Sequence, residues 1–215
     1  MTTCPVNARS ARMSLVAGML ALSSSAASAE SAASSRLIKC EGPFGRNAGH
    51  SDLVKAFGAK NVVDQEIDGV EGQKIKASVL YPDDPKARLE FVWSDEKARR
   101  RPTLIRATDQ SAWATANGIR IGTALAEIEQ MNGKPFKLSG FDWDYGGRVT
   151  DWQDGKLSKP LPGGCILGVD FVHPEDSPEA NLAKVTGEGE FLSDNADMRA
   201  VEPFVGTLII SYPKR

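Results

Sequence analysis

Two histidines are the side chains of this sequence best suited to general acid–base chemistry. His50 stands at the entrance of a predicted helix, and His173 precedes Pro174 at the end of a predicted strand. An imidazole base needs a hydroxyl or thiol to activate and a carboxylate to orient it, and the residues near the two histidines form no recognisable arrangement of such partners. Gly-x-Ser-x-Gly, the nucleophile turn of α/β-hydrolases, is absent from the sequence. A cell-envelope hydrolase with a histidine and carboxylate site is therefore an alternative, not the main hypothesis.

Metal and cofactor chemistry receive no support from residue spacing. No two histidines or cysteines lie within the two to five residues or so that are typical of zinc ligands. Asp142, Asp144 and Asp151 begin like a calcium loop, but Gly146 occupies the third acidic position and no glutamate closes the loop. We interpret these aspartates as solvated carboxylates, and we expect no metal and no cofactor.

A run of alternating aromatic residues gives the most informative signal for binding. Phe141, Trp143 and Tyr145 alternate with aspartates, which on a strand would place the three rings on one face. Exposed Trp and Tyr side chains can contact a protein or stack on sugar rings. The alternative, favoured for Phe141, is that the rings pack beneath a helix. The predicted binding residues are Trp93, Trp143, Tyr145 and Trp152.

A local positive cluster follows the first of these tryptophans. It consists of Lys97, Arg99, Arg100 and Arg101. Such a cluster can contact anionic lipid, lipopolysaccharide or an acidic partner, but it is more often a solvated hairpin tip that discourages edge-to-edge strand pairing. The whole chain has 26 basic and 28 acidic residues, and no aromatic residue adjoins the cluster. We therefore expect a solvated tip and no nucleic-acid binding.

Residues 1–29 are predicted to be a secretory signal peptide. Arg9 and Arg12 precede an apolar stretch at residues 13–22, and Ala-Ser-Ala ends at Ala29. The apolar stretch is about half of the roughly 20 residues that cross a bilayer, and no later stretch is long enough. We therefore expect a periplasmic or secreted protein without a transmembrane segment. Cleavage leaves 186 of the 215 residues, with 24 basic and 28 acidic side chains and a net charge of −4.

The cysteines agree with export. Cys4 leaves with the leader, so Cys40 and Cys165 remain and are expected to form a disulfide in an oxidising compartment. Lipid attachment at Cys40 is the competing hypothesis. Lys39 argues against it, because a lipoprotein cleavage box has a small residue at that position.

The mature chain, residues 30–215, has the length of a single domain. Helical spacing predicts helices at residues 51–57, after Thr123 and at residues 177–184. Strand patterns and turn residues predict strands at residues 62–67, 74–81, 88–94, 103–107, 136–145, 148–153, 165–172 and 207–212. We therefore expect an α+β fold in which short helices pack on one face of an antiparallel sheet.

Internal similarity predicts two related helix-plus-hairpin units, at about residues 47–110 and 117–160, followed by a C-terminal extension at residues 161–215. Trp93-Ser-Asp-Glu-Lys in the first unit aligns with Trp152-Gln-Asp-Gly-Lys in the second. Each of these segments follows a short helix that a glycine ends.

The second helix carries a motif of exported bacterial modules. Ile121-Gly-Thr-x-Leu-x-x-Ile-x-x-x-Asn-Gly-Lys-Pro135 resembles the helix motif of the SmpA/OmlA-like outer-membrane assembly lipoproteins and of the β-lactamase-inhibitor protein. The first helix matches less well, since His50 and Ser51 stand where the entry glycine is expected. The resemblance implies a helix on an antiparallel sheet and a non-enzymatic role, without binding specificity.

Together these features predict an exported, non-enzymatic protein that binds another macromolecule, an envelope or secreted protein, through aromatic residues on the free face of its sheet. The envelope hydrolase is one alternative. A small-ligand carrier is another, and it requires an apolar cavity between sheet and helices. The oligomeric state is left open.

Overall fold

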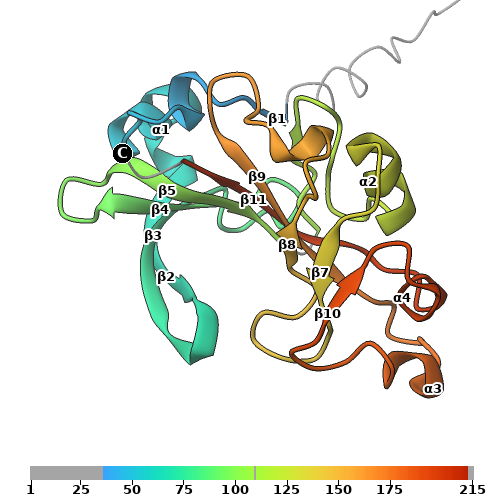
Figure 1. Cartoon of the computed structure of the whole chain (residues 1–215). Helices are drawn as coiled ribbons and strands as arrows, with labels where there is room; N and C mark the ends of the chain where they lie inside the picture. Colours follow the sequence, from blue (N-terminus) through green and yellow to red (C-terminus); the bar gives the residue numbers. More distant parts are fainter. Residues whose placement is uncertain (1–35, 109, 213–215) are drawn as a thin grey trace, which may run out of the picture.

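The computed structural model describes residues 36–108 and 110–212, so the predicted leader lies outside the described residues. The described chain has the α+β fold expected from the sequence (Figure 1). Its helices are α1 (His50–Phe57), α2 (Leu125–Asn132), α3 (Glu179–Leu182) and α4 (Ala196–Ala200). Its 3₁₀ turns are η2 (Gly42–Phe44), η3 (Ala59–Asn61), η4 (Val70–Gly72) and η5 (Lys156–Ser158).

The strands form a long sheet and a small sheet that adjoin. The long sheet is antiparallel and has the order β2-β3-β4-β5-β11-β9. Its strands are β2 (Val62–Asp68), β3 (Lys74–Leu80), β4 (Leu89–Asp95), β5 (Arg100–Ala107), β9 (Ile166–Val172) and β11 (Phe204–Ser211). The small antiparallel sheet has the order β10-β7-β8, formed by β7 (Lys137–Ser139), β8 (Val149–Asp151) and β10 (Glu190–Leu192). A bridge between Arg148 and Asp170 connects the two sheets.

The main core lies on one face of the long sheet. Leu89, Phe91 and Trp93 alternate along β4 and all point into this core, as their spacing predicts. The helices contribute Leu53, Leu125, Ile128 and Met198 to the same cluster. Burial of one large apolar side chain contributes about 1.5–3 kcal/mol, so this shared cluster fixes the helices on one face of the sheet.

The β2–β3 hairpin curls across the opposite face of the long sheet (Figure 1). The carbonyl oxygen of Asp68, at the end of β2, accepts a hydrogen bond of 2.8 Å from Arg106 Nη2 on β5. Ile67, Ala77 and Val79 are buried under this curl in a small second core. The curl therefore covers part of β4 and reaches β5 on that face.

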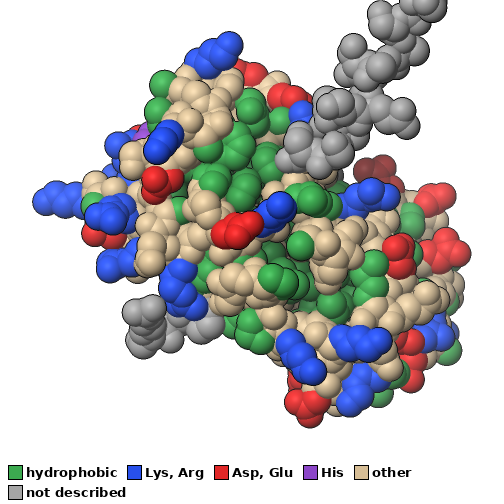
Figure 2. Space-filling view, turned by 90° about the horizontal axis from the view of Figure 1, so that it is seen from above, with side chains coloured by type: hydrophobic (Ala, Val, Ile, Leu, Met, Phe, Trp, Pro, Cys, Tyr) green, Lys and Arg blue, Asp and Glu red, His purple; other side chains and the backbone are tan. Residues whose placement is uncertain are grey.

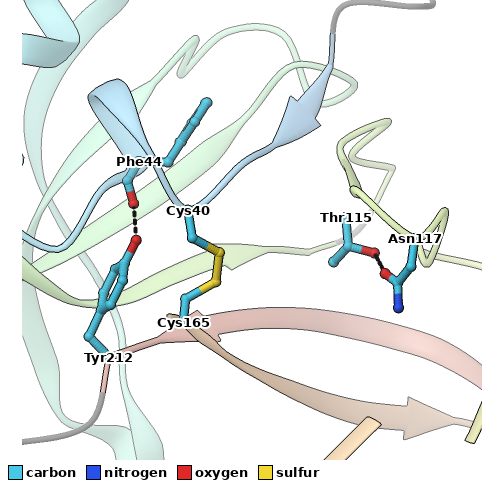
Figure 3. Close-up of a disulfide and its surroundings, with 6 residues drawn as sticks. All are labelled: Cys40, Phe44, Thr115, Asn117, Cys165 and Tyr212. Atoms are coloured by element: carbon cyan, nitrogen blue, oxygen red, sulfur yellow. Dashed lines mark hydrogen bonds between the residues drawn. A yellow bond between two sulfur atoms is a disulfide. The ribbon is translucent and has the colours of Figure 1, made fainter. Parts of the chain in front are cut away.

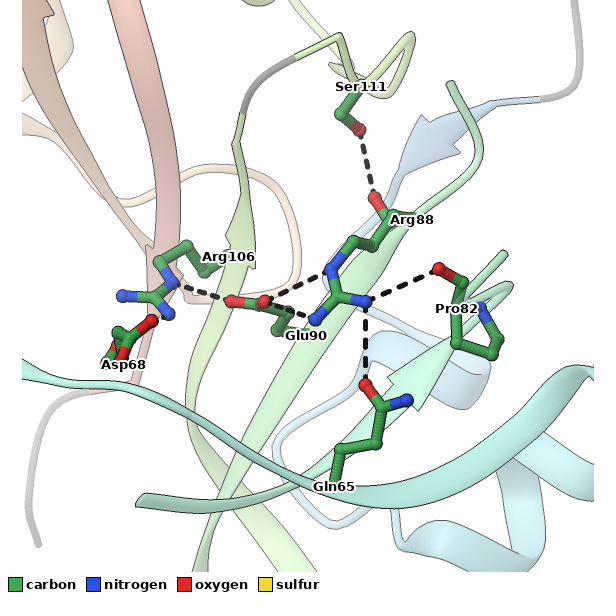
Figure 4. A network of polar contacts seen from close by, with 7 residues as sticks. All are labelled: Gln65, Asp68, Pro82, Arg88, Glu90, Arg106 and Ser111. Carbon is green, nitrogen blue, oxygen red and sulfur yellow. Dashed lines mark hydrogen bonds and ion pairs between the residues drawn. The ribbon is translucent and has the colours of Figure 1, made fainter. Parts of the chain in front are cut away.

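A buried carboxylate holds the curl in place. The Glu90 side chain is 7% exposed and accepts hydrogen bonds from Arg106 Nε (2.7 Å) and Arg88 Nη2 (2.9 Å). Arg88 Nη1 also reaches the side-chain oxygen of Gln65 on β2, at 3.4 Å. Figure 4 shows the two guanidinium groups on either side of the carboxylate. A buried charge is stable only when it is paired, so this network ties β2, β4 and β5 together.

The Cys40–Cys165 disulfide predicted from the sequence is present (Figure 3). The two Cα atoms are 5.8 Å apart and 125 positions apart in the sequence. The bond joins the segment before η2 to the start of β9. Nearby, the Tyr212 hydroxyl donates to the Phe44 carbonyl oxygen, and burial raises the pKa of Tyr212 to about 12. The N-terminal segment is thus attached to both β9 and the end of β11.

The same segment pairs with a second part of the chain. β1 (Leu37–Ile38) runs parallel to β6 (Ala114–Thr115), and this short pair is separate from the two larger sheets. It was not predicted, because two-residue strands leave no periodic signal in the sequence.

Most predicted elements are present with shifted ends. β5 begins at Arg100, three residues before its predicted start, so part of the basic cluster belongs to a strand. Pro102 is accommodated there because it lies beside a register shift and outside the β5–β11 pairing. α3 is shorter than the predicted helix at residues 177–184. The two related units stay a prediction.

One predicted strand is wrong. Residues 136–145 do not form a continuous strand, because β7 ends at Ser139 and residues 142–147 form a turn. Asp142 and Gly147 adopt left-handed backbone conformations, with φ of +62° and +68°. Aspartate and glycine tolerate this region, so turn chemistry overrides the alternating pattern.

Candidate functional site

Trp143 and Tyr145 lie in the turn between β7 and β8 and are both partly exposed. Their ring centroids are 5.4 Å apart and their planes meet at 61°, an edge-to-face contact. Trp143 Nε1 donates a 3.0 Å hydrogen bond to the carbonyl oxygen of Gly140, which anchors the indole to the backbone. Phe141 is 2% exposed and belongs to the core, as favoured from the sequence. The turn therefore presents a fixed pair of aromatic rings at the surface.

Arg148 connects this aromatic pair to the long sheet. Its guanidinium carbon lies 5.2 Å from the centre of the Tyr145 ring, in a cation–π contact. The same group donates from Nε and Nη2 to the two carboxylate oxygens of Asp170 on β9, at 2.9 and 2.8 Å. This hydrogen bonding raises the pKa of Arg148 further. A two-point Arg–carboxylate contact fixes orientation as well as position, so Tyr145 has a rigid support.

Beyond the curled hairpin, the second face of the long sheet carries both apolar and polar side chains. Two rows of cross-strand partners cross β5, β11 and β9 on this face: the first is Leu104, Ser211 and Ile166, and the second is Arg106, Ile209 and Gly168. Leu104 and Ile209 are partly exposed, whereas Ile166 is 37% exposed. We call these residues, together with Val172, the open face.

The open face and the aromatic turn are continuous. On β9, Ile166, Asp170 and Val172 point away from the main core, and Val172 is 41% exposed. Asp170 forms the two-point ion pair with Arg148, and Arg148 contacts the ring of Tyr145. The open face thus leads directly to the turn with its two aromatic rings. Sequence reasoning missed Arg148 and Asp170, because residues 22 positions apart gave no spacing signal.

The expectation that four aromatic rings share one open sheet face is wrong. Trp93 is 4% exposed, stacks on Phe91 at 5.8 Å and donates from Nε1 to Ser78 Oγ at 2.9 Å. The alternation along β4 places Trp93 on the face that the helices cover. Trp152 is partly buried against the main core, with its ring 5.1 Å from that of Phe136. Trp93 is therefore a core residue, and Trp152 packs against the core from a partly exposed position.

His50 meets part of the requirement for a hydrolase. Its Nδ1 lies 2.8 Å from Ser78 Oγ and 3.4 Å from Asp64 Oδ1. Both contacts use one ring nitrogen, whereas a catalytic triad uses one nitrogen for the hydroxyl and the other for the carboxylate. Ser78 is fully buried, and its Oγ also contacts Trp93 Nε1 and Asp64. This hydroxyl is therefore shielded from a substrate.

The surroundings of His50 favour the neutral imidazole. Burial lowers the pKa of His50, and the positive charge of Arg99 lowers it further, while the Asp64 carboxylate acts in the opposite direction. Arg99 forms an ion pair with Asp64, and its carbonyl oxygen accepts a 2.9 Å hydrogen bond from the His50 backbone N–H. The cluster joins α1, β2, β3 and the β4–β5 hairpin, which is a structural role.

Among the residues that the structure describes, His173 contacts a carboxylate but no hydroxyl or thiol. Its Nε2 lies 3.5 Å from Asp142 Oδ1, its Nδ1 lies 2.8 Å from the Pro174 carbonyl oxygen, and its ring packs against Phe141. The Thr186 hydroxyl donates a hydrogen bond of 3.3 Å to the other carboxylate oxygen of Asp142. The arrangement supports the start of the aromatic turn.

The surface also contains open grooves. One of about 620 Å³ lies between η2 and α1, and one of about 420 Å³ lies beside the His50 cluster, with Asp64, Lys76 and Arg99 in its walls. Both open to solvent and carry charged side chains, so neither is the enclosed apolar cavity that a small-ligand carrier requires.

Metal binding and membrane spanning find no candidate in the part of the chain that the structure describes. Within residues 36–108 and 110–212, no three His, Cys, Asp or Glu side chains are close enough to hold a metal ion. No helix in the same ranges is long and apolar enough to cross a membrane.

No family model, no curated protein and no solved structure matches this chain. The similarity of the α2 segment to SmpA/OmlA-like and β-lactamase-inhibitor-protein-like modules therefore stays a prediction from a short motif. The candidate site rests on the geometry of the molecule alone.

Proposed function

We propose that this protein is an exported, non-enzymatic module that binds another envelope or secreted protein. Trp143 and Tyr145 are the anchors of the contact, and the open face of β5, β11 and β9 extends it. Two of the four aromatic residues expected from the sequence keep the proposed binding role, and Arg148 joins them.

The observation that carries the proposal is the fixed, partly exposed Trp143–Tyr145 pair. Trp, Tyr and Arg are the residue types that dominate the binding energy of protein interfaces. An aromatic pair already locked by Gly140 and Arg148 loses little conformational entropy when a partner binds. The neighbouring aliphatic residues, such as Ile166 and Val172, supply apolar area that a partner can exclude from water.

A location outside the cytoplasm is part of this proposal. The predicted leader and the disulfide between Cys40 and Cys165 support it, because disulfides persist mainly in oxidising compartments. Its test is direct: the N-terminus of the purified protein should be Glu30. An N-terminus at Met1 would contradict the proposed export.

The proposed binding is tested by capture from envelope extract. Biotinylated wild-type protein and a Trp143→Ala/Tyr145→Ala variant are compared, with Leu37→Ala as the control, because Leu37 is an exposed apolar residue on β1. We expect wild type and control to capture the same proteins and the double variant to lose them while its urea midpoint stays near that of wild type. Equal capture by all three proteins would contradict the proposal.

A hydrolase that uses His50 is a second candidate, favoured only by the proximity of His50 to Ser78 and Asp64. Burial of Ser78 argues against it. If hydrolase activity were found and Ser78→Ala abolished it without unfolding the protein, the non-enzymatic proposal would be wrong.

A further inference from the structure

We infer that the partner presents a lysine- or arginine-rich segment to the Trp143–Tyr145 turn. This inference rests on the proposed function and adds the chemistry of the partner. It is carried by three observations: the distribution of charge along the chain, the carboxylates beside the rings, and the cation that already contacts Tyr145.

Charge is strongly segregated in this protein. Residues 36–108 contain 14 basic and 11 acidic side chains, a net charge of +3, whereas residues 141–202 contain 5 basic and 13 acidic side chains, a net charge of −8. Figure 2 shows Lys and Arg side chains gathered at the left edge of the molecule, on the side where the β4–β5 hairpin lies in Figure 1. The aromatic turn belongs to the acidic segment, so it lies in a region that attracts cations.

Carboxylates lie directly around the aromatic pair. Asp142 and Asp144 alternate with the rings in the turn and are both exposed. The chain at residues 185–189 runs beside the turn, as shown by hydrogen bonds from Gly140 N to Gly189 O and from Gly187 N to Phe141 O, both 2.8 Å. This neighbouring segment adds Glu188, which is also exposed.

These carboxylates are not neutralised by basic side chains of the protein itself. Within the described ranges, Asp144 and Glu188 form no ion pair, and Asp142 contacts the imidazole of His173, at 3.5 Å, and the hydroxyl of Thr186, at 3.3 Å. Other acids of the acidic segment are already paired, such as Asp170 with Arg148 and Glu190 with Lys137. Asp144 and Glu188, beside the exposed aromatic rings, thus carry charge that no basic side chain of the described residues pairs with.

The aromatic rings suit the same partner. Tyr145 already holds the Arg148 guanidinium against its ring at 5.2 Å, which demonstrates a cation–π contact in this turn. Trp143, whose ring gives the stronger cation–π contacts in general, contacts Tyr145 only with an edge-to-face geometry and remains partly exposed. A partner ammonium or guanidinium group can lie over Trp143 and pair with Asp144 or Glu188. Surface charge also raises the association rate with such a partner.

The test uses a fluorescein-labelled hexalysine peptide as probe and hexaglutamate and hexaserine peptides as comparisons, with binding followed by fluorescence anisotropy at low salt. We expect the wild-type protein to bind hexalysine and neither comparison peptide. Trp143→Ala should weaken hexalysine binding about threefold, the size of an exposed cation–π contact. Asp144→Asn/Glu188→Gln should weaken it about threefold to tenfold, as two surface ion pairs do.

A matched control separates local recognition from net charge. Glu71→Gln/Asp83→Asn makes the same change of charge at two exposed acids outside the acidic segment. We expect this variant to bind hexalysine like wild type. If it weakens binding as much as Asp144→Asn/Glu188→Gln, or if Trp143→Ala has no effect, the inference is overturned.

The outcomes for the inference and for the proposed function are distinguishable. If hexalysine does not bind but the envelope partner is still captured through Trp143 and Tyr145, the partner is not cationic and only this inference fails. If hexaglutamate or hexaserine binds better than hexalysine, the inference also fails. Loss of both hexalysine binding and aromatic-dependent capture would remove the proposed function as well.

Discussion

Removal of the Cys40–Cys165 disulfide should destabilise this protein strongly. The bond closes a loop of 125 residues, which covers most of the described chain. In the chain-entropy model, a loop of this length restricts the unfolded state by about 5 kcal/mol at 25 °C. Without the bond, the segment before η2 keeps the two-residue β1–β6 pairing, the burial of Ile38 and the contacts of Arg36 with Lys86 and Asp84. Within η2, Phe44 keeps its hydrogen bond with Tyr212.

The expected change is large enough for a simple assay. A loss of 5 kcal/mol corresponds to a fall in Tm of roughly 10–20 °C for a domain of this size, at about 2–4 °C per kcal/mol. Urea unfolding is measured for the oxidised protein, for the reduced protein and for Cys40→Ser/Cys165→Ser. The double variant serves as the control, since its urea midpoint should not respond to the reductant.

A stability that does not respond to reduction would contradict this prediction. If reduction left the urea midpoint and Tm of the wild-type protein unchanged, the long loop would not be closed by a disulfide in solution. Disulfides often stabilise proteins by less than the chain-entropy calculation gives, because the unfolded state retains structure. A loss below about 1 kcal/mol would nevertheless contradict the loop-closure argument.

Three further perturbations test other parts of the structure. Glu90→Ala leaves Arg88 and Arg106 without their shared carboxylate and should lower the free energy of unfolding by about 2–4 kcal/mol, measured in urea. This value is below that for a fully buried ion pair because both arginines are partly exposed. A loss equal to that of Glu66→Ala, an exposed control position, would contradict the role of the network. The pKa of His50 is lowered in the folded state, so the unfolded state binds the proton more tightly. The contribution of His50 to the free energy of unfolding should therefore be fully present above pH 6.5 and decrease as the pH falls below it. His50→Gln should flatten this dependence in urea midpoints between pH 5 and 7.5, and an unchanged slope would refute the assignment. Gly147 has a φ of +68°, and a Cβ there would overlap the Phe171 carbonyl oxygen, whereas Gly164 has a φ of +79° and open space around it. The left-handed backbone costs about 1–2 kcal/mol for alanine at either position, so Gly147→Ala should lower Tm far more than Gly164→Ala because of the overlap. Equal decreases in Tm would contradict the steric argument.

The sequence predicts the elements of this fold better than their assembly. Alternation over Leu89, Phe91 and Trp93 indicates the strand and its buried face correctly, because these rings meet one continuous core. The curl of the β2–β3 hairpin could not be predicted, since it depends on Arg106 and Asp68, which come together only in three dimensions. Glu90 likewise looks like an ordinary outward-facing strand residue until its two arginines are placed.

The sequence predicts only part of the candidate site, because the backbone preferences of two residues override the strand pattern. The alternating run from Phe141 to Tyr145 fits a strand, but Asp142 and Gly147 favour left-handed backbone and convert it into a turn. The two outer rings reach the surface through that turn and not through a sheet face. Trp93 misled the prediction, because a tryptophan that ends an alternating strand can be exposed or buried, and only the position of the helices decides.

Site-specific photo-crosslinking tests whether the aromatic turn contacts a partner protein. A benzoylphenylalanine residue is placed at position 145 in the aromatic turn and, in a separate variant, at position 37 on β1, and each protein is irradiated in its own envelope extract. We expect a discrete crosslinked product from position 145 that is suppressed by Trp143→Ala, and no such product from position 37. Equal crosslinking from both positions, or none from position 145, would contradict this expectation.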